Sequence, residues 1–146
     1  SQSDMFLTVF YAELDTRDGR LTYANAGHNP PLLWRAAEGR FDLLAPTCPL
    51  LGVLPELTVH VIETWLAPGD VLVLYTDGIV EAFDRDYNEF GRARLEEIVG
   101  DLLRQHPQAT TDEVRETIIS SVRAFAGSAT QVDDMTLLII RRGDSL

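Results

Sequence analysis

The stretch that decides the fold is residues 69–82, which read GDVLVLYTDGIVEA. Within it, the run 71–76 follows a Pro-Gly turn and is almost entirely apolar. A short apolar run bounded by turn residues is typical of a strand that is buried on both faces. The run leads directly into Asp77 and Gly78, so the sequence predicts a carboxylate at the end of a buried strand.

Two helices and a second apolar strand follow this stretch. Apolar residues recur at the helical period in residues 95–103 and again in residues 114–125. Thr110 and Glu113 have the spacing of a capping box ahead of the second helix. Residues 135–140 (MTLLII) carry apolar side chains on both faces of an extended chain, which predicts a last strand that is buried on both faces.

Short segments rich in β-formers precede the decisive stretch. Residues 6–14 and 21–26 predict one hairpin, residues 32–35 and 41–44 predict another, and residues 59–65 predict a further strand. Strands that are grouped before helices favour an α+β layered fold over a doubly wound one.

Composition limits the classes of function. The chain has 146 residues, which we assign to a single domain, 1–146. A net charge of -11 argues against a nucleic-acid partner, which needs a basic surface. No apolar run approaches the roughly 18 to 20 residues of a membrane span, and the N-terminus has no pattern of a signal peptide. The single cysteine, Cys48, excludes an internal disulfide and fits a reducing, cytoplasmic setting.

Acidic residues next to the two apolar strands are the candidates for chemistry. Asp133 and Asp134 directly precede the last strand, and Asp77 directly follows the earlier one. If these strands are neighbours, Asp77 and Asp133 face each other at one sheet edge, where carboxylate oxygens suit Mg²⁺ or Mn²⁺. Gly78 leaves room for backbone or water, and His28 lies in a tight turn where it could donate a proton. The same residues also fit an ordinary Asp-Gly turn, a solvated loop and a surface histidine.

Four segments together resemble the motifs of the SpoIIE-like branch of type 2C (PPM) protein phosphatases, in the family's order. They are residues 23–31 (YANAGHNPP), residues 69–82, residues 90–95 (FGRARL) and residues 133–136 (DDMT). The resemblance implies a layered β-sandwich with flanking helices and a dinuclear Mg²⁺ or Mn²⁺ centre at one end of it. It also implies hydrolysis of phosphoserine or phosphothreonine by metal-activated water, without a covalent enzyme intermediate.

The resemblance assigns roles to individual residues. Asp77 and Asp133 match two aspartates that bind one of the two metals. Gly78 is a further candidate at the metal centre, and so is Asp134, although other branches often have asparagine there. His28 matches a turn near the catalytic edge.

The chain departs from the family pattern at its N-terminal side. The earlier motif, with the aspartate that bridges both metals, has no counterpart here, and neither have the first strands and the two helices that cover one sheet. We therefore expect the C-terminal part of a phosphatase domain, weakly active or inactive by itself. We also expect an uncovered apolar sheet face that a second copy would bury in a homodimer.

These observations leave three alternative functions. The first is a bacterial signalling phosphatase, whose substrate the resemblance suggests is a phosphorylated anti-anti-sigma factor of the STAS type. The second is a non-catalytic regulatory or interaction module of a signalling protein. The third is an unrelated acidic, β-rich binding domain, which would need four coincidental motif matches.

Overall fold

The fold consists of two antiparallel sheets and a layer of helices. The computed structural model describes residues 7–48, 59–129 and 134–143. Its elements are β1 (Val9–Leu14), β2 (Arg20–Ala26), β3 (Leu32–Arg35), β4 (Arg40–Leu43), β5 (Ile62–Trp65), β6 (Val71–Tyr75), α1 (Asp77–Val80), α2 (Arg92–Gln105), α3 (Thr111–Ala126) and β7 (Leu137–Arg141). Strands therefore precede helices, with one strand at the end, as the sequence predicts.

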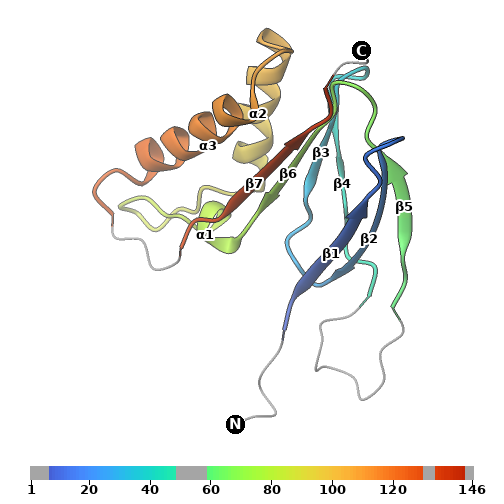
Figure 1. Cartoon of the computed structure of the whole chain (residues 1–146). Helices are drawn as coiled ribbons and strands as arrows, with labels where there is room; N and C mark the ends of the chain where they lie inside the picture. The colour runs from blue at the N-terminus through green and yellow to red at the C-terminus, as the bar shows by residue number, and fades with distance from the viewer. Residues whose placement is uncertain (1–6, 49–58, 130–133, 144–146) are drawn as a thin grey trace.

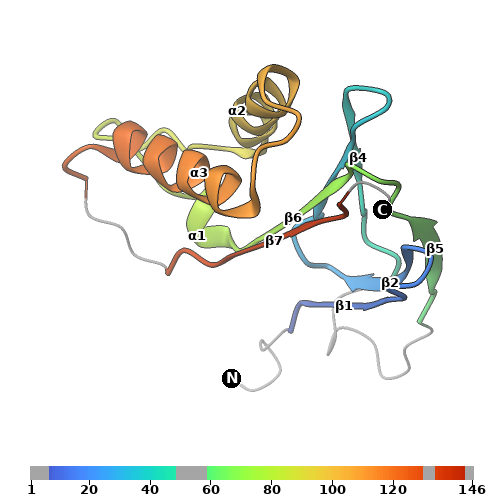
Figure 2. The ribbon, with the colours of Figure 1, turned by 45° about the horizontal axis from the view of Figure 1, so that its top comes forward.

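The elements form three layers (Figures 1 and 2). One sheet has the strand order β1-β2-β5 and the other has the order β4-β3-β6-β7. The helices α2 and α3 cover the outer face of the four-stranded sheet, and the three-stranded sheet packs on its inner face. This is the α+β layered sandwich with flanking helices that was expected.

Strand β6 is central because it contributes to two hydrophobic cores. Val71, Val73 and Tyr75 pack with the apolar stripes of α2 and α3. Leu72, on the opposite face, packs between the two sheets. Side chains alternate between faces along a strand, so an apolar run of this kind fills both cores at once. The predicted burial of β6 on both faces is thus confirmed.

The ends of the helices follow their capping residues. The Thr110 hydroxyl accepts a hydrogen bond from the Glu113 amide at 3.1 Å, which satisfies one of the free amides of the first turn of α3. At the other end, Gly127 has a φ of 58°, a left-handed conformation that glycine adopts without strain.

Two features of the fold differ from the sequence predictions. The short helix α1 was not predicted, since four residues are too few for a periodic pattern. The predicted burial of the last strand on both faces is wrong, because Leu138 is 55% exposed on β7, which is an edge strand among the described residues. An edge strand has a neighbour on one side only, and this cannot be read from its own sequence.

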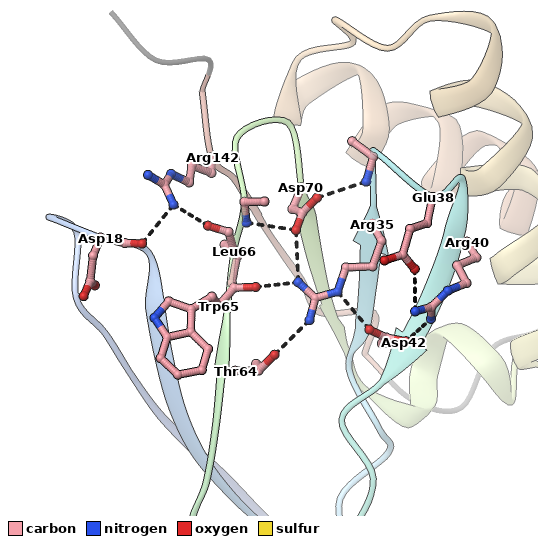
Figure 3. A network of polar contacts seen from close by, with 12 residues as sticks. Asp18, Arg35, Glu38, Arg40, Asp42, Thr64, Trp65, Leu66, Asp70 and Arg142 are labelled. Atoms are coloured by element: carbon pink, nitrogen blue, oxygen red, sulfur yellow. Dashed lines mark hydrogen bonds and ion pairs between the residues drawn. The ribbon is translucent and has the colours of Figure 1, made fainter.

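A network around Arg35 connects the two sheets at one end of the sandwich (Figure 3). Arg35 ends β3, and its guanidinium donates to Asp42 at 2.8 Å and to Asp70 at 3.1 Å. It also donates to the Thr64 hydroxyl at 2.8 Å and to the Trp65 carbonyl, both in β5 of the other sheet. The network therefore joins strands that share no backbone hydrogen bonds.

Asp70 completes the network from the turn before β6. Its side chain is 2% exposed, and its carboxylate also accepts hydrogen bonds from the amides of Ala36 and Ala67, each at 2.9 Å. A buried carboxylate is tolerated when both of its oxygens accept hydrogen bonds in this way.

We predict that Asp70→Ala lowers the free energy of unfolding by about 3 kcal/mol, because it leaves the Arg35 guanidinium without its buried counter-ion. Urea denaturation checks this. Asp101→Ala is the matched control, since it breaks a surface pair with Arg104 that is 3.3 Å long and more than half exposed on both sides. The control should cost at most roughly 0.5 kcal/mol. Equal losses in the two variants would contradict a clamping role for Asp70.

Candidate active site

The open cavity at the other end of the sandwich gathers residues from four segments that are distant in the sequence. Its volume is about 420 Å³. It is lined by Thr8, Gly27, His28, Asn29, Thr76, Asp77, Gly78, Asp134 and Thr136. Four of the five residues predicted for the site, which are His28, Asp77, Gly78 and Asp134, thus surround one cavity. The fifth, Asp133, lies outside the described residues, so its predicted role stays a prediction.

Asp77 occupies the position that the buried strand predicts. It directly follows Thr76, the residue after β6, and is the first residue of α1. Its side chain is exposed, and its carboxylate accepts a hydrogen bond from the Asn29 side-chain amide. The strand before it is fixed by two cores, so the carboxylate is held at a defined place and stays open to solvent.

Gly78 allows the segment before β7 to lie directly against α1. A Cβ atom at Gly78 would stand 2.0 Å from the Asp134 carbonyl oxygen, far closer than atoms can approach. The neighbouring Thr76 amide donates to the Thr136 carbonyl, and the Thr136 amide donates to the Thr76 hydroxyl, both at 3.2 Å. Glycine is therefore required here for a close backbone approach, and this approach places Asp134 beside Asp77.

His28 is fixed in its turn by two hydrogen bonds. Its backbone amide donates to the Asn25 side chain at 2.8 Å, and its Nδ1 lies 3.0 Å from the Asn29 carbonyl oxygen. A carbonyl only accepts, so Nδ1 carries the proton and Nε2 is the acceptor of the neutral ring. The structure places His28 at the cavity, and its predicted part in proton transfer stays a prediction.

Tyr75 ties the same turn to β6. Its hydroxyl donates to the Pro30 carbonyl at 3.0 Å. Burial raises the pKa of Tyr75 to about 12, so the hydroxyl keeps its proton and remains a donor throughout the neutral range. The turn that carries His28 is therefore fixed from the strand that leads to Asp77.

Sequence reasoning missed Asn25 and Asn29. Asn25 is fully buried and lies on the inward face of β2, which it shares with the apolar Leu21 and Tyr23. A polar residue at such a position must find partners inside the fold, and this was the available signal. Asn29 has no comparable signal, because asparagine before proline is an ordinary turn residue.

The donors at the cavity fit a hard cation as part of its ligand shell. The carboxylates of Asp77 and Asp134 are both exposed, and Mg²⁺ and Mn²⁺ prefer oxygen ligands. Within the described ranges, no group of three or more His, Cys, Asp or Glu side chains is close enough to hold a metal ion.

The helices of the described part of the chain include none with the length and apolar character of a membrane span.

Comparison with known sequences identifies relatives of this chain. Residues 1–143 match the family model described as Stage II sporulation protein E (SpoIIE). The chain is 33% identical over 138 residues to Protein IcfG of Synechocystis sp., a match that covers 94% of this chain and 21% of that protein. It is 28% identical to Phosphoserine phosphatase RsbP of Bacillus subtilis, over 92% of this chain and 30% of that protein. The chain thus spans less than a third of the length of these two relatives.

Solved structures share the fold. The SiaA-PP2C domain of Pseudomonas aeruginosa superimposes with a TM-score of 0.71 and 25% identity, over 90% of this chain and 50% of that one. The RsbU and RsbW domains of Rv1364c from Mycobacterium tuberculosis give a TM-score of 0.72 and 28% identity, over 95% of this chain and 38% of that one. The phosphatase domain of SpoIIE from Bacillus subtilis, presoaked with Mn, gives a TM-score of 0.66. The chain therefore belongs to the SpoIIE family and has the fold of PP2C (PPM) phosphatase domains.

Proposed function

We propose that the protein carrying this chain is a metal-dependent protein Ser/Thr phosphatase. The observation that carries the proposal is the meeting of Asp77, Asp134 and the His28 turn at one open cavity, in a chain of the SpoIIE family. Two relatives from Bacillus subtilis are named phosphoserine phosphatases, RsbP and the 29% identical RsbU, and they support the same activity.

The residues of the cavity would bind and orient the reacting groups. Asp77 and Asp133 would bind Mn²⁺ or Mg²⁺, and Asp134 and the backbone at Gly78 would add oxygen donors at the same centre. The two cations of the complete centre would supply an activated water at neutral pH and neutralise charge on the phosphoryl group. His28, with Nε2 as acceptor, would take or return a proton at the edge of the cavity.

We propose a phosphorylated regulatory protein as the substrate, of the STAS anti-anti-sigma type, in a cytoplasmic signalling pathway. The relatives RsbP and RsbU support a phosphoserine-bearing protein, and the acidic chain with its single cysteine fits this setting. We also propose that the chain by itself is weakly active or inactive. Mg²⁺ needs six ligands in near-ideal geometry, and Asp77 and Asp133 alone would supply too few of them.

The activity is tested by Mn²⁺-dependent hydrolysis of a phosphoserine peptide by the full-length gene product. Asp77→Asn should lower kcat/KM by about 100-fold or more, because even the loss of a residue that supports a ligand typically costs about 10- to 100-fold. Asp101→Asn, an exposed aspartate of α2, is the matched control and should leave the rate unchanged. This chain, assayed alone, should be slower than the full-length protein, because it supplies too few ligands for tight Mg²⁺ binding.

Two outcomes would count against these proposals. Full activity in Asp77→Asn would remove Asp77 from the metal centre. If the full-length protein neither hydrolyses the peptide nor binds Mn²⁺, the non-catalytic regulatory module becomes the better account.

We further propose a homodimer formed through the outer face of the β1-β2-β5 sheet. The support is a shallow apolar hollow of about 340 Å³ on that face. It is lined by Val9, Tyr11, Ala24, Ala26, Cys48, Val59 and Val61. Tyr11 and Val61 are 58% and 59% exposed, and clustered apolar side chains of this kind tend to be buried by association.

Sedimentation of the chain at micromolar concentration tests the dimer. The unchanged chain should sediment as a dimer, and Val61→Lys should convert it to a monomer, since a buried lysine charge is costly. Leu138→Lys, at a site of similar exposure on the other sheet, should leave the dimer intact. A monomeric unchanged chain would contradict the proposal.

A further inference from the structure

The turn that carries Asn29 is held by a fully buried amide. The Asn25 side chain is 0% exposed and uses its donors and its acceptor at once. Its Nδ2 donates to the His28 carbonyl at 3.2 Å and to the Leu44 carbonyl at 3.0 Å, and its Oδ1 accepts from the His28 amide at 2.8 Å. A buried polar group with every bond satisfied fixes its partners in one arrangement. The backbone of the turn is therefore rigid next to Asn29.

The backbone of Asn25 is itself anchored to a different segment. Its amide donates to the Thr47 hydroxyl at 3.0 Å, and its carbonyl accepts from the Thr47 amide at 2.8 Å. On the far side of the turn, the Tyr75 hydroxyl holds the Pro30 carbonyl. The turn is thus fastened on both sides of Asn29, to the segment that carries Thr47 on one side and to β6 on the other.

From this turn, the Asn29 amide donates a hydrogen bond to Oδ1 of Asp77. The contact joins residues that are 48 positions apart in the chain. An ionised carboxylate only accepts, and its two oxygens offer about four acceptor positions. A donor that occupies one position on Oδ1 fixes the rotation of the carboxylate and leaves Oδ2 for another partner.

The chemistry of the donor suits a residue that supports a metal ligand. A lysine or arginine at this place would hold the carboxylate equally well, but its positive charge would repel an incoming cation. The amide of asparagine is neutral and orients the ligand without that repulsion. Partners of this kind, which hydrogen-bond to a ligating carboxylate, orient it toward the metal.

We propose that Asn29 is a positioning residue for the metal site, in which the turn stapled by Asn25 holds the Asp77 carboxylate in its binding orientation. The inference rests on the proposed function, because it assigns Asn29 to a centre that includes Asp77. It adds to that centre a residue that does not itself bind the cation.

The test measures Mn²⁺ affinity in the full-length gene product, from the electron paramagnetic resonance signal of free Mn²⁺ during titration. Asn29→Ala should weaken Mn²⁺ binding about tenfold, and its melting temperature in EDTA should equal that of the unchanged protein. Asn88→Ala is the matched control, because the Asn88 side chain donates to the Asp84 carboxylate at 3.2 Å in an exposed loop. The control should leave Mn²⁺ affinity unchanged.

A third variant, Asp77→Asn, separates this inference from the proposed function. If Asp77→Asn abolishes tight Mn²⁺ binding and Asn29→Ala does not weaken it, the positioning role is wrong and the metal site stands. If Asp77→Asn has no effect on Mn²⁺ binding, both are wrong. If Asn29→Ala lowers the melting temperature in EDTA, where no Mn²⁺ is bound, the hydrogen bond serves the fold and the positioning role is overturned.

Discussion

The arrangement of the two sheets depends on the guanidinium of Arg35, which an ion pair with Asp70 holds in place. Within each sheet, backbone hydrogen bonds fix the register of the strands. Between the sheets, the contact is mainly apolar packing, which is strong but has no preferred direction. Arg35 supplies the direction, because its planar guanidinium reaches a carboxylate beside β6 and the hydroxyl and carbonyl of β5 at the same time. The sheets are therefore locked at one end by a group whose geometry allows little variation.

The opposite end of the sandwich carries the candidate site, and β3 and β6 connect the two ends. Trp34 pairs with Val71 near the clamp, and Leu32 pairs with Val73 two residues closer to the cavity. Beyond these pairs, the chain enters the turn of His28 and Asn29 on one strand and reaches Asp77 on the other. Polar contacts are thus concentrated at both ends, and the middle is apolar. This division lets the open end expose carboxylates without weakening the core.

Sequence patterns anticipated most of the features that depend on neighbours along the chain, although not the short helix α1. The apolar run of β6, the helical stripes and the Thr110 cap are local, and so the fold class and the place of Asp77 followed from them. The exposure of Leu138 was mispredicted because it depends on the order of strands in the sheet. The contacts of Arg35 and Asn29 were not anticipated either, since their partners lie 35 and 48 residues away. An asparagine in a turn and an arginine at a strand end are both ordinary residues at such positions, so the sequence gives no sign of their distant partners.

The double burial of β6 has a mechanical consequence. The strand carries Val73 and Tyr75 on the helix side and Leu72 on the sheet side, and it continues through a single residue into Asp77. No flexible linker separates the helix layer from the carboxylate. The side chains that pack against α2 and α3 therefore belong to the same strand that positions Asp77, so the helix layer supports the carboxylate without touching the cavity.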